Sequence, residues 1–477
     1  MKIIQLVRGY SKGDGVGNVI TALDQMFERL GYQAEILNRE LTAEDVDDKI
    51  FSDDVLLFYH VALSVDPLVS FLKCRKILVF HNITDPDLLL GKGLMELRMQ
   101  CSAGLYDIGL ILGYFDGAIA FSEYSKRVLV DRGWNGIKIF TIPLPVRFDK
   151  LSEKPDRMVT EKYCDGCTNI LFAGRVMPHK KFEDVISAFA AYKKKYNKTS
   201  RLFLVGGIGN NYYYKALKDY VKELEIEEDV YFPGHVSFAE YCAYYHVADV
   251  FLCMSAHEGF CIPLAEAMYF DKPIIAAANA AIPDTLDGSG VLVTDESFED
   301  IADIINRLVS DAEYKKTILD TERERLEQLQ PDKLEPQYEK VIKDCILMTE
   351  HHDAASSRSL PFISLEGIDI SDDRIKTNPV VVYGYGAAGG RLVKYLLDEG
   401  VDITCVCDRT ADESGGGSSD GVPVVQPESA IRMNPDCIYI ISVQSKKIVR
   451  DITVWLIENG VSGNNIFVFD EIKGEVC

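Results

Sequence analysis

Two acidic residues in the middle of the chain have a spacing that suits sugar chemistry. Glu258 and Glu266 lie eight positions apart in the stretch HEGFCIPLAEAM, which begins at His257. The apolar run before it predicts a buried strand, and Pro263 suits the first turn of a helix, where its missing N–H costs nothing. The amides after Glu258 would then lie at a helix N-terminus, which binds anions such as a diphosphate. Two carboxylates beside an anion need other partners, and sugar hydroxyls fit because carboxylates are strong acceptors.

Two basic residues provide a second group suited to an anion. Arg175 and Lys180 follow a predicted strand at 170–173, in the sequence ILFAGRVMPHKK, and precede a predicted helix. Arginine offers bidentate hydrogen bonds and lysine a point charge, so the two side chains can converge on one diphosphate. We therefore predict that they bind a diphosphate.

Together these groups resemble the motifs of retaining GT-B glycosyltransferases of family 4, and the resemblance covers about residues 1–350. It implies that Glu258 contacts the donor sugar and that Glu266 contacts the ribose of the nucleotide. It also implies that Arg175 and Lys180 neutralise the departing nucleoside diphosphate. Sites of this kind need no metal ion, and no DxD-like acidic cluster is evident at the expected cleft.

Further segments resemble the same family. Gly15 best matches the glycine loop that closes over the donor diphosphate, although a tight turn without a ligand is the alternative. His81 follows a predicted strand, where members carry a histidine close to the reactive carbon and the acceptor. Cys261 and Lys181 stand where members often have glycine, and we expect the small cysteine to be tolerated. The implied donor-binding residues are Gly15, Gly234, Val236, Gly259, Phe260, Cys261, Ile262 and Glu266.

The elements that must position these residues alternate between short apolar runs and helical segments. The runs are rich in Val, Ile and Phe, and apolar residues recur at helical spacing between them, as in 16–30. This pattern predicts an α/β fold with buried parallel strands. A proline-bearing stretch at 142–148 separates two doubly wound Rossmann-like domains, 1–145 and 146–350, which resemble the GT-B architecture with a final crossover helix. Ligands should bind in the cleft between them, at the carboxyl ends of strands.

A third, smaller Rossmann-like domain is expected at 379–477, after a linker at 351–378 that is poor in regular signals. A strand, GxGxxG, a helix and an acid about 20 residues on are the context of a dinucleotide site. However, no substrate lobe or hydride-transfer residue can be named, so a structural, regulatory or oligomerisation role stays open beside a bound nucleotide. The candidate residues of such a site are Gly384, Gly386, Gly389 and Asp408.

Composition excludes several classes of protein. The net charge of −23 argues against nucleic-acid binding, which needs basic patches. The start of the chain reads as a strand rather than a signal peptide, and no apolar run is long enough to span a bilayer, so we expect a cytoplasmic protein. Its nearly neutral first third leaves contact with the inner face of the membrane open. The twelve cysteines suit a reducing compartment, and the single CxxC, Cys164 to Cys167, lacks the second pair of a zinc site.

These observations predict a retaining hexosyltransferase that uses a nucleotide sugar, with UDP or GDP as the nucleotide, and a saccharide or lipid-linked acceptor. The resemblance implies a role in bacterial polysaccharide or glycolipid synthesis. One alternative is a sugar-nucleotide epimerase of the same architecture, which would rearrange the donor without an acceptor. Another is a non-catalytic nucleotide-sugar-binding scaffold, with the third domain as its interaction module.

Overall fold

The computed structural model describes most of the chain, in two compact units, Met1–His352 and Asp353–Cys477. The described residues are 2–10, 15–46, 49–134, 138–347, 373–384, 387–398, 400–408, 417–419, 421–434, 436–442, 452–453, 455–457, 459–462 and 465–468. Gly386 and the predicted linker as far as residue 372 lie outside them.

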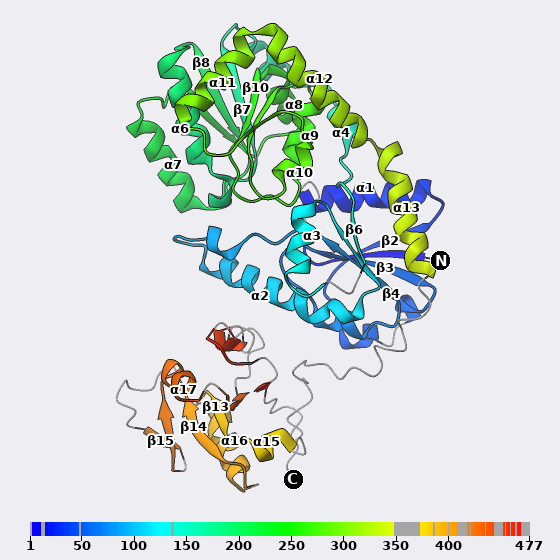
Figure 1. The fold of residues 1–477 in the computed structure, drawn as a ribbon, viewed down its shortest axis with the longest axis vertical. Coiled ribbons are helices and arrows are strands. Elements are labelled where there is room, and N and C mark those ends of the chain that lie inside the picture. Colours follow the sequence, from blue (N-terminus) through cyan, green and yellow to red (C-terminus); the bar gives the residue numbers. More distant parts are fainter. Residues whose placement is uncertain are drawn as a thin grey trace. The chain divides into compact units, whose positions relative to one another are not determined.

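The first unit begins with a six-stranded parallel sheet in the order β2-β1-β3-β4-β5-β6. Its strands are β1 (Lys2–Val7), β2 (Gln33–Asn38), β3 (Val55–Val61), β4 (Arg75–Phe80), β5 (Gly117–Ala120) and β6 (Ile139–Thr141), and its main helices are α1 (Gly15–Arg29), α2 (Met95–Ile111) and α3 (Glu123–Val130) (Figure 1). Side chains of β3 alternate between two apolar clusters: Leu56 and Phe58 join one, and Leu57 and Tyr59 join the other. Both faces of the sheet are therefore covered, which explains why its strands read as continuous apolar runs.

A second six-stranded parallel sheet follows in the same unit, in the order β12-β11-β10-β7-β8-β9. Its strands are β7 (Thr168–Ala173), β8 (Ser200–Val205), β9 (Val230–Gly234), β10 (Val250–Cys253), β11 (Ile274–Ala277) and β12 (Val291–Val293). Its helices are α4 (Phe148–Leu151), α5 (Arg157–Tyr163), α6 (Phe182–Lys195), α7 (Asn211–Glu223), α8 (Phe238–Val247), α9 (Ile262–Tyr269), α10 (Ile282–Leu286), α11 (Phe298–Ser310) and α12 (Ala312–Gln328). The switch in strand order at β10 and β7 opens a crevice at their carboxyl ends, where such sheets bind ligands.

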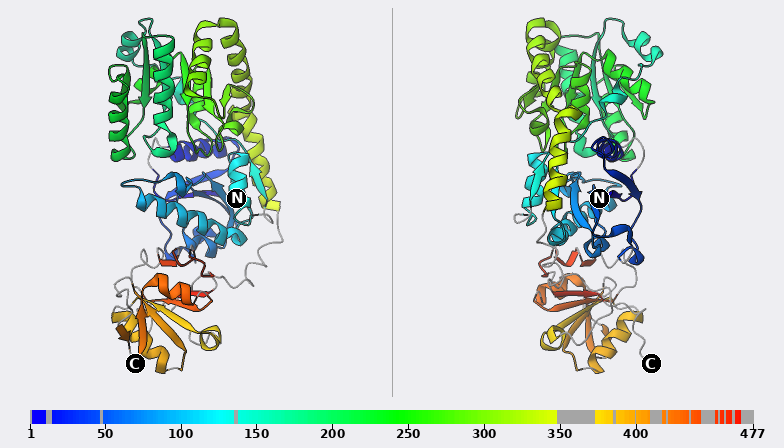
Figure 2. Two further views of the ribbon diagram at one scale, coloured as in Figure 1. Left: turned by 60° about the vertical axis from the view of Figure 1, so that its left-hand side comes forward. Right: turned by 90° about the vertical axis from the view of Figure 1, so that its right-hand side faces the viewer.

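Helix α13 (Pro331–Leu347) returns from the second sheet to the first, as Figures 1 and 2 show. Glu335 forms an ion pair with Arg29 of α1 at 2.6 Å, and the Tyr338 hydroxyl donates to the carbonyl of Pro143 at 3.3 Å. Tyr338 is fully buried in an apolar cluster that also contains residues of both sheets. The helix therefore fastens the two α/β domains together at their connection.

The second unit holds a six-stranded sheet in the order β15-β16-β14-β13-β17-β18, in which only β15 is antiparallel to its neighbour. Its elements are α15 (Asp373–Thr377), β13 (Val380–Tyr383), α16 (Ala387–Asp398), β14 (Ile403–Cys407), β15 (Gly417–Ser419), β16 (Val422–Val425), α17 (Pro427–Met433), β17 (Ile438–Ile441) and β18 (Ile466–Val468). The predicted linker is wrong at its end, because α15 lies within 351–378 and its Ile375 is fully buried in the core of this unit. One buried isoleucine among polar residues leaves too weak a pattern to be read as a helix.

Candidate active site

The two predicted groups meet in an ion pair between Lys180 and Glu258. The ammonium of Lys180, at the end of the 3₁₀ turn Pro178–Lys180, lies 2.5 Å from the Glu258 carboxylate. Glu258 is only 8% exposed, and burial opposes its ionisation, but the charge and hydrogen bond of Lys180 outweigh burial and lower its pKa. Burial likewise opposes the charge of Lys180, and Glu258 reverses the effect, so the pKa of Lys180 is raised. The pair is therefore held in its charged form.

The structure explains why glycine suits two positions at which this chain departs from the family pattern. Lys181 has φ +51° and Cys261 has φ +69°, both in the left-handed region. A side chain with Cβ costs about 1–2 kcal/mol in this conformation, whereas glycine adopts it freely. Cysteine in place of glycine at position 261 therefore costs backbone strain. The small size of the cysteine side chain does not remove this cost.

The N-terminus of α9 presents unpaired amides beside this ion pair. Cys261 precedes the helix without a side-chain cap, and Pro263 occupies its first turn. Within the described parts of the chain, no acceptor is found for the amides of Phe260, Cys261 or Ile262. A Cβ on Gly15, the first residue of α1, would lie 3.9 Å from Cδ1 of Ile262. The glycine of the first domain therefore lies opposite the N-terminus of α9 in the second.

Glu266 is held by two tyrosines that the sequence analysis missed. Its carboxylate accepts hydrogen bonds from Tyr241 at 2.6 Å and from Tyr245 at 3.1 Å, both on α8. Burial raises the pKa of Glu266, and the two hydroxyls partly counter this effect. The tyrosines stand four residues apart, so they share one face of a helix, and this spacing is the signal that could have revealed them.

His81 follows β4 and is paired with a second histidine. Its Nε2 lies 2.8 Å from Nδ1 of His60, which is buried at the end of β3. Burial lowers the pKa of His81 to about 3, so the imidazole is neutral at physiological pH. The ring also packs edge-on against Phe121, with centroids 5.2 Å apart. The sequence analysis did not predict the His60 contact, because residues 60 and 81 become neighbours only when β3 pairs with β4.

The segment after His81 contacts the HEGFC loop directly. The side-chain amide nitrogen of Asn82 lies 3.2 Å from Nε2 of His257 and donates to the carbonyl of Glu258 at 3.4 Å. A Cβ on Gly259 would stand 2.7 Å from the carbonyl of His81, so only glycine fits without displacement. The hydroxyls of Ser122 and Ser125, at the start of α3, donate to the carbonyl of Gly259 at 3.1 and 3.3 Å. The two domains therefore touch at the predicted motif, through the hydroxyls of these two serines.

A cavity of about 590 Å³ opens beside this contact, on the side of the first domain. Tyr124 and His257 form one wall, and the hydroxyl of Tyr124 lies 3.4 Å from Nδ1 of His257. Helix α2 contributes Leu105 and Tyr106, and Arg132 adds a half-buried charge. Helix α2 thus lines a cavity next to the HEGFC loop.

The remaining predicted donor residues lie around the second sheet. Arg175 is exposed after β7, and in the described segments it has no side-chain partner, which leaves its guanidinium free for an anion. Gly234 ends β9 with φ +78°, its carbonyl accepts the amide of Gly206 at 3.1 Å, and Val236 follows it half-buried. These positions are compatible with the predicted roles.

The glycines of the second unit lie apart from this site in the chain. Gly384 follows β13 with φ +108°, Gly389 lies in α16, and Asp408 follows β14, with its amide bonded to the carbonyl of Val425. Gly386 lies outside the described residues. A nucleotide at this fingerprint therefore stays a prediction.

Comparisons with known proteins identify the architecture. The first unit resembles the Anabaena HepE protein solved with UDP and glucose, with a TM-score of 0.57 and 17% identity over 72% of this chain and 99% of that one. A glycosyltransferase from Rickettsia africae gives a TM-score of 0.58 at 15% identity, over 73% and 99% of the two chains. These likenesses establish the GT-B fold, in which two Rossmann-like domains face a cleft.

Sequence comparisons give partial matches. Residues 165–325 match the family described as "Glycosyl transferases group 1". An alpha-monoglucosyldiacylglycerol synthase of Streptococcus pneumoniae is 28% identical over 34% of this chain and 38% of its own length. A D-inositol 3-phosphate glycosyltransferase of Kineococcus radiotolerans is 26% identical over 41% of this chain and 49% of its own length. The chain thus spans less than half of these curated relatives. The stretch that matches the family model includes Arg175, Lys180, Glu258 and Glu266. No helix of the described residues is long and apolar enough to cross a bilayer.

Proposed function

We propose that this chain is a retaining glycosyltransferase that moves a sugar from a nucleoside-diphosphate sugar to a hydroxyl group of its acceptor. The observation that carries this proposal is the buried pair of Lys180 and Glu258 beside the unpaired amides before α9. A cation and free amides suit a diphosphate, and a carboxylate suits sugar hydroxyls. The matched family and the UDP and glucose in the HepE structure support a nucleotide sugar as the donor.

In the proposed reaction, the donor diphosphate binds at the amides of Phe260 to Ile262 and draws Lys180 toward it. Glu258 is then free to accept hydrogen bonds from hydroxyls of the donor sugar, while Arg175 adds a second positive charge at the phosphates. These charges stabilise the leaving diphosphate as the bond between its oxygen and the sugar carbon breaks. No metal ion is required for this neutralisation. Glu266, held by its two tyrosines, would accept from the ribose.

The acceptor hydroxyl would attack from the same face of the sugar that the diphosphate leaves. A new bond then forms between the acceptor oxygen and the sugar carbon, and the hydroxyl proton passes to an oxygen of the departing phosphate. His81 is a poor general base, because burial keeps its pKa near 3. We assign it instead to holding the donor sugar or the acceptor in position, with His60 fixing its ring.

We assign the acceptor to the cavity next to Tyr124 and His257, since this cavity adjoins the donor motif. Its mixture of tyrosines, aliphatic side chains and charges suits a saccharide or the sugar head of a lipid-linked acceptor. The glycolipid synthase among the relatives supports a role in bacterial polysaccharide or glycolipid synthesis. We place the enzyme in the cytoplasm, at the inner face of the membrane. The second unit would serve regulation or oligomerisation, or would bind a nucleotide of its own.

The first test is ligand-induced thermal stabilisation of the full chain by UDP, GDP, ADP, dTDP, CMP, their sugars, NAD(H) and NADP(H). A ligand at 100 times its dissociation constant stabilises the folded state by about 2.7 kcal/mol. We expect one nucleoside diphosphate and its sugar to raise the melting temperature, and Arg175→Ala to weaken the effect. Stabilisation by dinucleotides alone would point to the second unit and contradict the proposal.

Product analysis with the stabilising donor then separates the alternatives. Without an acceptor, a transferase only hydrolyses the donor slowly. When an acceptor is added, it forms a glycoside with the same anomeric configuration as the donor sugar. An epimerase would yield a rearranged nucleotide sugar without acceptor, and a scaffold would bind the donor unchanged. Lys180→Ala is expected to abolish transfer, so unchanged transfer in this variant would remove the leaving-group assignment.

A further inference from the structure

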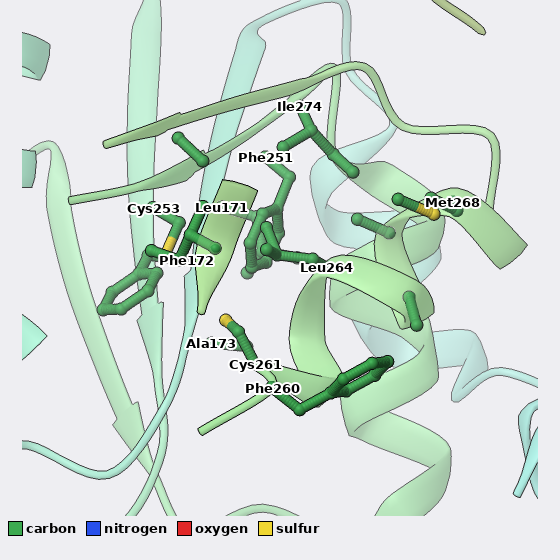
Figure 3. Close-up of a cluster of buried hydrophobic side chains, with 14 of the residues drawn as sticks. Leu171, Phe172, Ala173, Phe251, Cys253, Phe260, Cys261, Leu264, Met268 and Ile274 are labelled. Atoms are coloured by element: carbon green, nitrogen blue, oxygen red, sulfur yellow. The ribbon is translucent and has the colours of Figure 1, made fainter. Parts of the chain in front are cut away.

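Two buried thiols lie next to the carboxylate of the proposed donor site. Cys253 ends β10, and Cys261 occupies the turn before α9, as Figure 3 shows. One ligand atom each from Cys253, Glu258 and Cys261 lies within 4.8 Å of the other two. All three residues are less than a tenth exposed: 0%, 8% and 5% in this order.

From this cluster we infer a regulatory metal site: Cys253, Glu258 and Cys261 bind a thiophilic divalent cation, Zn²⁺, which inhibits the proposed transfer reaction. The site itself follows from the side chains, whereas the inhibition rests on the proposed function. The ligand set matches the preference of zinc for thiolate sulfur and carboxylate oxygen, with water in the fourth position. Nothing in the proposed transfer reaction uses either thiol.

The geometry is close to that of a zinc centre. Zinc–sulfur bonds of about 2.3 Å in a tetrahedral site place two sulfurs roughly 3.8 Å apart. The observed ligand atoms, within 4.8 Å of one another, need to approach by at most about 1 Å, which small side-chain rotations achieve. The three ligands are close in sequence and lie on the end of one strand and the loop after it, so no domain movement is needed.

The charges also balance. Binding releases one proton from each thiol, and the two thiolates and the carboxylate then carry three negative charges. Zn²⁺ supplies two positive charges, and Lys180, 2.5 Å from Glu258, supplies the third. A buried site without net charge avoids the large cost of an unpaired buried ion. The metal would compete with the donor sugar for Glu258, and this competition is the source of the inhibition.

The backbone at Cys261 provides independent support. The residue keeps φ +69°, which costs about 1–2 kcal/mol relative to glycine. Backbone strain of this kind clusters at ligand-binding positions, where the interaction of the side chain with its ligand offsets the strain energy. A thiol facing a second thiol and a carboxylate is such a use.

The test is a Co²⁺ titration of the reduced full-length chain, because thiolate-bound tetrahedral Co²⁺ gives a charge-transfer band and intense visible bands. Cys164→Ser serves as the background, since Cys164 and Cys167 are the accessible thiols of the CxxC. We expect one Co²⁺ per chain, displaced by Zn²⁺, with two protons released. Cys253→Ala should abolish the bands, and Cys242→Ala, a buried thiol of α8, should retain them.

Absence of the bands, or their persistence in Cys253→Ala, would overturn the inference. The spectrum requires no transferase activity, so the metal site and the proposed function can fail separately. With an active donor and acceptor, Zn²⁺ is expected to lower the transfer rate at least tenfold in the background chain. Cys253→Ala should keep its basal transfer and lose this inhibition. Equal inhibition in both chains would refute the regulatory role.

Discussion

Replacement of Lys180 by alanine tests the electrostatics of the site most directly. The ammonium lies 2.5 Å from the Glu258 carboxylate, and the two side chains are 17% and 9% exposed. Removal of one partner of a buried pair leaves the other charge uncompensated, which typically costs about 3–5 kcal/mol. We therefore expect Lys180→Ala to lower the free energy of unfolding by about 3 kcal/mol at neutral pH.

The pH dependence of the variant provides a sharper readout. In the unchanged protein the pKa of Glu258 is lowered, so the pair stabilises the fold above the unfolded pKa, and this contribution is lost as pH falls through the folded pKa. Without Lys180, burial dominates and raises the pKa of Glu258. Its contribution then has the opposite sign, so the variant should become less stable as pH rises from about 4.5 toward neutrality.

The assay is urea unfolding at pH 5 and pH 7.5 for the original protein, Lys180→Ala, Glu258→Gln and the double variant. The double variant should recover much of the stability that Lys180→Ala loses, because it carries no uncompensated charge. A coupling energy above about 1 kcal/mol is expected from this cycle. Additive effects of the two substitutions, or no pH dependence in Lys180→Ala, would refute the idea that the pair is buried and charged.

Three further predictions concern packing and titration. Lys181→Gly should raise the free energy of unfolding by about 0.5–1 kcal/mol in urea. The strain energy relieved at the left-handed φ of +51° exceeds the free-energy cost of the extra chain entropy that glycine gives the unfolded state. A loss of stability would contradict this. Gly259→Ala should weaken donor binding at least tenfold by calorimetry, since its Cβ would meet the carbonyl of His81 at 2.7 Å, whereas Gly207→Ala, with only a contact at 3.9 Å, should bind normally. Burial raises the pKa of Glu322 to about 8, so the folded protein loses stability as pH rises from about 4.5 to 8. Glu322→Gln should lack this loss, so its free energy of unfolding relative to the original protein should rise by about 1.4 kcal/mol per pH unit over this range. Equal slopes of melting temperature against pH in both proteins would disprove this.

Much of the fold could be predicted from local patterns. Strands buried on both faces read as unbroken apolar runs, and α1 buries Val19, Ile20, Leu23, Met26 and Phe27 at helical spacing, which confirms the predicted amphipathic segment. These signals depend on residues a few positions apart, so a single sequence contains them. The short helix α15 escaped prediction, because its core contact depends mainly on Ile375.

The candidate site divides in the same way. The sequence predicted two local groups from spacing around strand ends. One group contains Glu258 and Glu266, eight positions apart, and the other contains Arg175 and Lys180, five positions apart. The link between the groups was predicted only in general terms, as convergence on one diphosphate. The sequence could not show that Lys180 contacts Glu258, because 78 residues separate them.

Sequence alone determined the α/β class, the donor motif and the residue types available for chemistry, because each follows from short-range spacing and from the preferences of individual side chains. Tertiary structure decided which partners those residues have. It brought His60 to His81, Tyr241 and Tyr245 to Glu266, and Asn82 to His257. Such contacts arise where strand order and domain closure join distant segments, and burial there sets the pKa values and charges on which the chemistry depends.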